Sequence, residues 1–260
     1  MKNLSRGLAA SALVLGLSLQ LHAGNVLIIN GSSQTSEPGT TSAITTNLQT
    51  LHQAVGNTVT ISDSVPANLA GYGQIWDIRF SNSLPITAGQ QAQYLSFLAA
   101  GGGMFVMGEN SGFTTRNDSV LALITAAGGG TLGFTTPNST QTVVGPFTGP
   151  NPVSQITYAA PGGVGTNAPG TGDWITVDNN GNGTGIAFSV GDLANAQAGA
   201  LTVIFDVNFM MNQYDVPNSQ NLTKNLIGFV GGQVDRTPDA GSTLALLAGS
   251  LVFLAYFRRK

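Results

Sequence analysis

The residues with the clearest potential for chemistry form one turn, Gly108-Glu109-Asn110-Ser111-Gly112, between a predicted strand and a predicted helix. Its G-x-N-x-G pattern has the form of a nucleophile elbow, with Asn110 in the nucleophile's place. A carboxamide has no deprotonated nucleophilic form near neutral pH, so Asn110 cannot act as a thiolate does. Ser111 lacks a neighbouring base. We therefore interpret this turn as a degenerate elbow with a structural role.

The composition excludes several other kinds of site. The 260 residues include no cysteine and two histidines, His22 and His52. Disulfide frameworks, iron–sulfur clusters, zinc–cysteine sites and multi-histidine metal centres are therefore excluded. We expect His52 to be an exposed helix residue. Trp76 and Trp174 are expected to be core or sheet-face aromatics.

Carboxylates offer an alternative chemistry. Glu109 together with Asp77 or Asp206 could form the acid–base pair of a polysaccharide or peptide hydrolase. Such pairs in glycosidases lie within about 10 Å of each other. The sequence does not show whether these side chains converge, so a hydrolase stays an alternative to a non-enzymatic role.

Two polar segments resemble ligand loops without completing the pattern. Asp178, Asn180 and Asn182 match the opening of a calcium loop, but Ser189 stands where the pattern requires glutamate. We expect a hairpin turn there. A periplasmic module that binds a small molecule or calcium is the alternative, and no other cofactor is expected. Residues 31–41 could hold an anion at a helix N-terminus, but they lack the lysine of a phosphate-binding loop. We expect a solvated loop.

The order of predicted elements indicates an α/β domain with a parallel sheet. Strands are predicted over 25–30, 58–62, 73–80, 104–107 and 201–206. Helices are predicted over 44–55, 87–100, 118–127 and 218–230. Between them, residues 131–200 are rich in glycine, proline, asparagine and threonine, which predicts a β-rich, loop-rich insertion.

Strand 73–80, helix 87–100, strand 104–107 and the elbow together resemble the class I glutamine amidotransferase-like fold. The closing strand 201–206 and its DVNF sequence are similar to the end of secreted, often inactive members of that superfamily. The resemblance implies a three-layer, flavodoxin-like architecture and a domain that binds ligands or partners. The superfamily's cysteine would fall at Asn110, so glutaminase chemistry is excluded and we expect a non-enzyme.

The charges divide the chain into a body and two ends. Between Gly24 and Arg236 there are four cations and eleven acids, a net charge of −7, whereas the whole chain carries −3. Four scattered cations cannot form the basic patch that neutralises phosphates. Nucleic-acid binding is therefore not expected.

The N-terminal residues 1–23 have the pattern of a signal peptide. Lys2 and Arg6 precede an apolar stretch, and Ala23 provides a small residue at the cleavage point. We expect cleavage between Ala23 and Gly24. The body, residues 24–232, would then be exported.

The C-terminus has the pattern of a membrane anchor. Residues 241–257 carry no charge, and Arg258, Arg259 and Lys260 follow them directly. This predicts a transmembrane helix over 241–257 with the basic tail 258–260 in the cytoplasm, joined to the body by residues 233–240.

A short motif precedes this span: Thr237, Pro238, Asp239, Ala240 and Gly241. Together with the span and tail it resembles the PEP-CTERM type of sorting domain, and its VPDSG-CTERM class above all. Thr237 and Ala240 depart from that class. The resemblance implies processing by an exosortase, a transpeptidase of Gram-negative bacteria. It also implies transfer to the cell surface or an extracellular matrix that contains exopolysaccharide.

Overall fold

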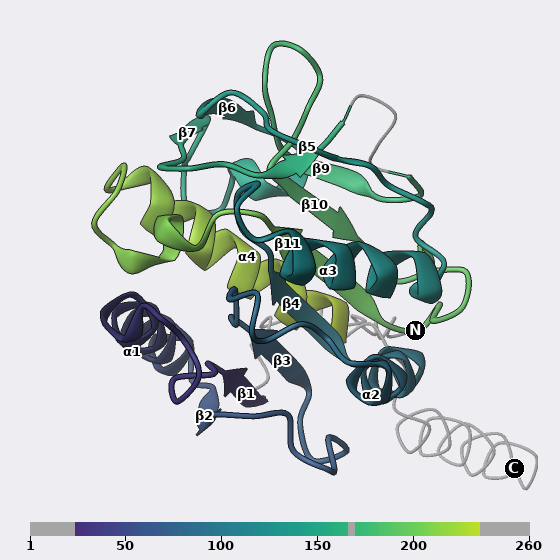
Figure 1. Cartoon of the computed structure of the whole chain (residues 1–260). Coiled ribbons are helices and arrows are strands. Elements are labelled where there is room, and N and C mark those ends of the chain that lie inside the picture. The colour runs from purple at the N-terminus through teal and green to yellow at the C-terminus, as the bar shows by residue number, and fades with distance from the viewer. Residues whose placement is uncertain (1–23, 166–169, 235–260) are drawn as a thin grey trace, which may run out of the picture.

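The computed structural model describes residues 24–165 and 170–234. Nine of its strands form one sheet in the order β2-β1-β3-β4-β11-β10-β9-β6-β7, and β5 and β8 form a separate pair (Figure 1). The strands are β1 (Asn25–Ile29), β2 (Thr58–Ser62), β3 (Gln74–Asp77), β4 (Gly103–Met107), β5 (Phe134–Thr135), β6 (Thr140–Val143), β7 (Gln155–Thr157), β8 (Gly163–Val164), β9 (Asp173–Val177), β10 (Gly185–Phe188) and β11 (Ala200–Ile204). The helices are α1 (Pro38–Ala54), α2 (Ala88–Ala99), α3 (Thr114–Ala127) and α4 (Asn218–Val234), with 3-10 turns η1 (Gly145–Thr148) and η2 (Val207–Met211).

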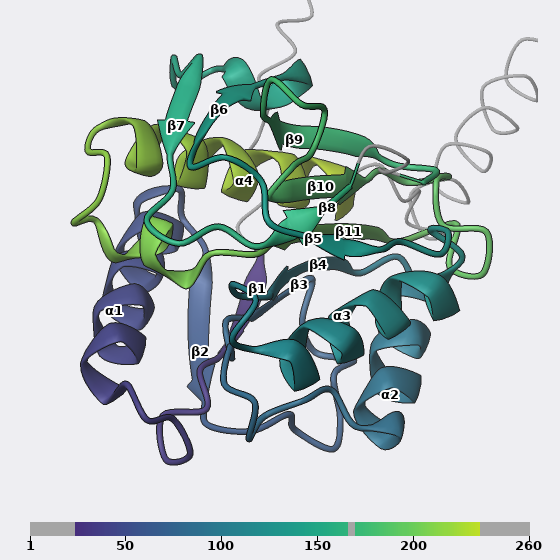
Figure 2. The ribbon, with the colours of Figure 1, turned by 45° about the horizontal axis from the view of Figure 1, so that its top comes forward.

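The prediction of a parallel sheet is wrong, because the sheet is mixed. Strands β2, β1, β3, β4 and β11 are parallel, but β10, β9, β6 and β7 continue the same sheet by antiparallel pairing (Figure 2). The β-rich character predicted for residues 131–200 is confirmed, and this segment builds about half of the mixed sheet. Short strands of this kind give no local signal of the strand they pair with, so the sequence pattern did not join them to the parallel strands.

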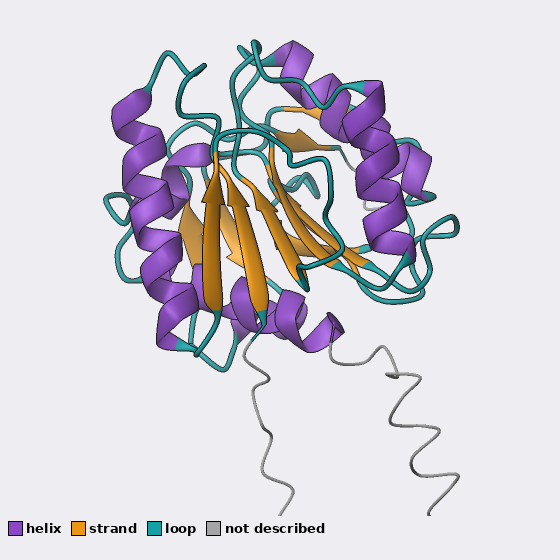
Figure 3. Ribbon diagram, turned by 90° about the horizontal axis from the view of Figure 1, so that it is seen from below, coloured by secondary structure: helices purple, strands orange, loops and turns teal. Residues whose placement is uncertain are grey.

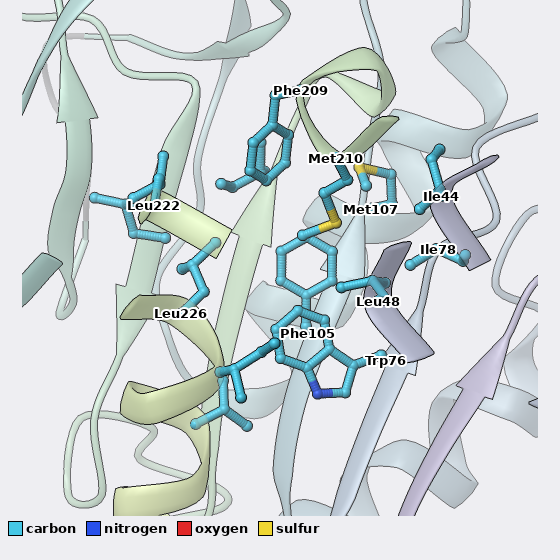
Figure 4. Packing of buried hydrophobic residues seen from close by; sticks show 14 of the residues in the cluster. Ile44, Leu48, Trp76, Ile78, Phe105, Met107, Phe209, Met210, Leu222 and Leu226 are labelled. Atoms are coloured by element: carbon cyan, nitrogen blue, oxygen red, sulfur yellow. The ribbon is translucent and has the colours of Figure 1, made fainter. Parts of the chain in front are cut away.

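Helices cover both faces of the sheet, which makes three layers (Figure 3). Successive strand residues point to opposite faces, so Trp76 and Phe105 pack with α1 and α4, whereas Ile75 and Met104 pack with α2 and α3. On the first face, Trp76 and Phe105 stack with ring centroids 4.8 Å apart (Figure 4).

Local signals explain two of the helix ends. Thr87 caps α2 by accepting from the Gln90 backbone N–H, and the Gln90 side chain accepts from the Thr87 backbone N–H in return. Gly128 ends α3 in the left-handed conformation, with φ of 90°, which glycine adopts without a steric penalty. Helix α3 begins at Thr114, four residues before the predicted start, and this first turn brings Arg116 and Asn117 into the interior.

His52 is buried, so the prediction of an exposed helix residue is wrong. Its ring lies edge-on to Trp76, with centroids 4.8 Å apart, and its Nδ1 lies 3.0 Å from Asn57 Nδ2. Because the amide nitrogen donates, Nδ1 accepts and the ring proton sits on Nε2. Burial lowers the pKa of His52 to about 4. Trp76 is a core residue as expected, and Trp174 is half-buried against the other cluster.

Several predicted features lie outside the described residues. These are the signal sequence 1–23, the sorting motif Thr237–Gly241, the span 241–257 and the basic tail Arg258–Lys260. The prediction of a transmembrane helix has no support in the structure. In residues 24–165 and 170–234, no helix has both the length and the apolar character needed to cross a membrane.

We predict that His52 makes the fold acid-sensitive. Its folded pKa of about 4 lies below the ordinary value of 6.5, so the unfolded chain binds more protons between these values. The stability that the neutral ring contributes is complete above pH 6.5 and falls by about 3 kcal/mol as the pH drops to about 4. Urea unfolding of the wild type and His52→Leu across this range measures the difference. Gln53→Leu, an exposed change one residue away, should keep the wild-type pH dependence, and an equal pH dependence in His52→Leu would contradict the prediction.

Candidate functional site

The carboxyl ends of the parallel strands meet at one edge of the sheet, where α/β folds bind ligands. Three predicted carboxyl groups lie there: Asp77 ends β3, Glu109 lies two residues beyond β4, and Asp206 lies two residues beyond β11. All three are buried. Their partners decide what each can do.

Asp77 forms ion pairs with two arginines, Arg79 and Arg116. Its carboxylate accepts from Arg79 Nε at 2.8 Å and Nη2 at 2.7 Å, and from the Tyr94 hydroxyl at 2.9 Å. Arg116 Nη2 lies 3.4 Å away. Burial by itself would raise the pKa of Asp77, but the charges of Arg116 and Arg79 outweigh burial and hold the pKa below its usual range. Asp77 is thus a fixed anion within an ion cluster, without a role as a proton donor.

Glu109 bridges two strand ends. One carboxyl oxygen accepts from the Asn110 backbone N–H at 3.0 Å, and the other accepts from the Val207 backbone N–H at 2.7 Å. Its residue is only 2% exposed. Burial, together with the nearby charge of Asp206, raises the pKa of Glu109 to about 7.

Asp206 holds the neighbouring loops. It caps η2 by accepting from the Asn208 backbone N–H at 2.8 Å, and it accepts from the Ala160 backbone N–H at 3.0 Å. Burial raises its pKa. Gly162 follows in the same loop and donates to the Phe205 carbonyl at 2.7 Å. A Cβ on Gly162 would lie 2.3 Å from the Glu109 carbonyl, so the loop lies directly over the strand ends.

The elbow is held by hydrogen bonds within the turn and from α3. Asn110 Nδ2 donates to the Glu109 carboxylate at 2.8 Å, and Asn110 Oδ1 accepts from the Gly112 backbone N–H at 2.9 Å. Asn117, one turn into α3, donates to the carbonyls of Glu109 and Asn110 and accepts from the Glu109 backbone N–H. Gly108 is required by packing, since a Cβ there would lie 2.2 Å from the Phe205 ring.

The loops outside this buried layer form an exposed rim that is tied together. Asn82 Nδ2 donates to the Gly112 carbonyl at 2.9 Å, and Ser83 Oγ donates to the Gln34 carbonyl at 2.9 Å. Ser111 is exposed on the same edge. We call this surface the polar rim and define it by the exposed residues Ser32, Ser33, Gln34, Asn82, Ser83 and Ser111.

The predicted anion loop is engaged by a carboxylate of the chain itself. Asp63 accepts from the Ser33 backbone N–H at 2.7 Å and from the hydroxyls of Ser32 and Ser33. The hydrogen bonds from Ser33 lower the pKa of Asp63. Donors that could hold a phosphate are therefore bound to an anion already.

The segment of Asp178, Asn180 and Asn182 is a hairpin turn between β9 and β10, as expected. Asp178 accepts from the backbone N–H groups of Asn180 and Asn182 through one oxygen and of Asn138 through the other. Asn180 and Asn182 contribute backbone donors here. Within the described ranges, no group of three or more histidine, cysteine or acidic residues is arranged to hold a metal ion.

A cavity of about 400 Å³ lies elsewhere, between residues 67–70 and α2. Its lining includes Leu69, Phe97 and Ala100. None of its lining residues belongs to the carboxyl edge. The cavity and the buried carboxyl groups thus lie in different parts of the fold.

No model of a known protein family matches the sequence, and no curated protein matches it. Solved structures with a similar fold include the following three. The mmIFT52 N-terminal domain has a TM-score of 0.56 at 12% identity, covering 79% of this chain and 96% of that one. A putative ThuA-like protein from Bacteroides uniformis has a TM-score of 0.52 at 13% sequence identity, and the match covers 81% of this chain and 90% of that one.

The third similar structure is the exo-β-1,4-mannosidase Op5Man5 from an Opitutaceae bacterium. Its TM-score is 0.51 at 12% identity, and the match covers 80% of this chain but 35% of the mannosidase. At these identities the similarity shows the α/β fold alone. It assigns neither an activity nor its absence.

Sequence reasoning missed the partners of the carboxyl groups. Arg79, Arg116 and Asn117 are among the most buried polar residues, yet no sequence motif marks any of the three. One signal was present: Arg79 and Arg116 are two of only four cations between Gly24 and Arg236. In so poorly charged a body, an isolated arginine near a strand end indicates a buried ion pair.

We predict that Glu109 acts on stability with the opposite sign to His52. Its folded pKa of about 7 lies above the ordinary value of 4.5, so the folded chain holds the extra proton between these values. Stability contributed by the protonated group is complete below pH 4.5 and falls by about 3 kcal/mol as the pH rises past 7. Unfolding of the wild type relative to Glu109→Gln from pH 4.5 to 8.5 measures this loss. Asp173→Asn, which removes an exposed carboxylate of β9, should follow the wild type. A free-energy difference between wild type and Glu109→Gln that stays constant with pH would refute the raised pKa of Glu109.

A thiol at the elbow should not create an amidotransferase. In Asn110→Cys the buried surroundings supply no histidine to ionise the thiol, because His52 is locked against Trp76 on the other face of the sheet. We expect no glutamine hydrolysis above the uncatalysed rate, measured by ammonia release. Ser111→Cys is the matched control for an exposed thiol. Hydrolysis by Asn110→Cys alone would show that the site retains catalytic machinery.

Proposed function

We propose that this domain is a non-catalytic binding module of an exported protein, with the polar rim as its ligand-binding surface. The observation that supports the proposal is the hydrogen bonding of the Asn110 side chain. Asn110 occupies the nucleophile position, and both ends of its amide are bonded within the elbow. A site arranged in this way positions backbone and rim without presenting a reactive group.

The chemistry of the polar rim favours a neutral, hydroxyl-rich ligand such as a polysaccharide. Its six defining residues are serine, glutamine and asparagine, whose side chains donate and accept hydrogen bonds. The hydroxyls of Ser32 and Ser33 donate to Asp63, so these two offer a ligand their acceptor lone pairs. The bonds from Asn82 and Ser83 to neighbouring loops hold the rim in one arrangement. Rigid donors and acceptors lose little entropy on binding.

Export is part of the same proposal. It is supported by the signal-peptide pattern of residues 1–23 and by the resemblance of Thr237–Gly241 to an exosortase motif. An exosortase-processed protein in a matrix of exopolysaccharide would meet a neutral polysaccharide at high local concentration. The sorting step itself stays a prediction, since its residues lie outside the described ranges.

A carboxylate hydrolase is the second candidate. It is favoured by one observation: the pKa of Glu109 is raised to about 7 beside Asp206, as in an acid catalyst. Against it, Glu109 is 2% exposed and the loop carrying Gly162 covers it. Cleavage of envelope polysaccharide that disappears in Glu109→Gln would favour the hydrolase over the binding module.

The binding proposal predicts the effect of a bulky charge on the rim. Ser111→Arg places a long cation on an exposed elbow position without removing a hydrogen bond of the fold, so we expect at least a tenfold weaker affinity for the host's neutral exopolysaccharide. Affinity electrophoresis measures it. Gln53→Arg makes an equivalent change in the last turn of α1, at the opposite edge of the sheet, and should bind as the wild type does. Equal affinity of the two variants would place the ligand elsewhere.

A further inference from the structure

Gly24, the residue after the predicted cleavage point, is bonded through both of its backbone groups. Its N–H donates to Asn57 Oδ1 at 3.0 Å, and its carbonyl accepts from the Thr58 backbone N–H at 3.0 Å. Two consecutive residues at the start of β2 thus hold the residue that precedes β1.

Asn57 connects this residue to the core. It is 8% exposed, and its amide is oriented by its partners: Gly24 N–H can only donate, so Oδ1 faces Gly24 and Nδ2 faces His52. His52 is fully buried and its ring lies edge-on to Trp76. A chain of contacts therefore runs from Gly24 through Asn57 and His52 to Trp76.

We propose that the amino group of Gly24, formed when the Ala23–Gly24 bond is cut, stabilises the mature domain by donating a hydrogen bond to Asn57 Oδ1. The inference rests on the export proposed above. Hydrolysis by a signal peptidase adds one water across this bond. The carboxylate leaves with Ala23, and the amine stays on Gly24, protonated at neutral pH as an ammonium group.

The surroundings favour an ammonium over the amide that it replaces. A hydrogen bond from a charged donor is about twice as strong as one between neutral groups. His52 is neutral above pH 4, so it does not repel the new charge. The body's net charge of −7 also favours an added cation. The cleaved chain thus makes a charge-assisted hydrogen bond to Asn57 where the uncut chain makes a neutral one.

The geometry also fixes the order of events. A protease needs an extended, accessible chain on both sides of the bond that it cuts. Gly24 is held by Asn57 and Thr58 in the folded domain. Cleavage therefore precedes the docking of Gly24, and the folded domain keeps the new terminus in place.

The test compares a free with an acetylated terminus on the mature chain, Gly24–Lys260, prepared by ligation. Acetylation keeps a donor N–H and removes the charge. We expect it to raise the unfolded fraction in urea about three- to fivefold, as the difference between charged and neutral donors requires. In Asn57→Ala the acetylation effect should vanish. Asn25→Ala removes another side-chain hydrogen bond, to the Gly71 carbonyl, and should keep the full effect.

An acetylation effect that persists in Asn57→Ala, or is absent from the wild type, overturns the proposal. Should Asn57→Ala fail to fold, the pKa of the ¹⁵N-labelled Gly24 amine in the wild type is measured by NMR titration instead. A pKa above the ordinary value of about 7.7 supports docking, and an unshifted value overturns it. N-terminal sequencing of the exported chain tests processing separately: a start at Gly24 supports the proposal and another start overturns it. Neither result depends on ligand binding at the polar rim.

Discussion

The structure depends on satisfying three buried carboxyl groups at the carboxyl edge of its parallel strands. An unpaired charge in the interior costs several kcal/mol, so each group needs its own donors. Asp77 accepts hydrogen bonds from Arg79 and Tyr94 and forms an ion pair with Arg116, which joins β3 to α2 and α3. Glu109 takes them from Asn110 and Val207, and Asp206 from Ala160 and Asn208. These bonds fasten the ends of β4 and β11 to each other and to the loop above them.

The same requirement separates structure from function at this edge. The carboxyl groups that could take part in catalysis lie in the buried layer, where they accept hydrogen bonds from the fold. Above them, the polar rim is exposed and carries hydroxyls and amides. The Gly108–Gly112 turn carries Asn110 at its centre, and both ends of that amide are bonded within the turn. The elbow then serves as a support for the rim.

Part of this arrangement was predictable from local sequence. Strands β1, β4 and β11 appear as short apolar runs because both of their faces are covered, and the elbow is visible in the spacing of Gly108 and Gly112. The mixed sheet was not predictable, since short strands such as β6 and β7 carry no local signal of the strands they pair with. Nor was the burial of His52, which depends on Asn57 and Trp76 together. The ion cluster of Asp77 joins residues up to 39 positions apart, and nothing near Arg116 in sequence indicates its partner.

The carboxyl groups at this edge are buried and hydrogen-bonded to the fold. A carbon-13 NMR titration of the labelled side-chain carboxyl groups measures the consequence of that burial. We expect Asp77 to stay ionised to the lowest pH at which the fold survives and Glu109 to titrate near pH 7. A Glu109 resonance that titrates near the ordinary value of 4.5 would show a solvated, accessible carboxylate and refute its burial in solution.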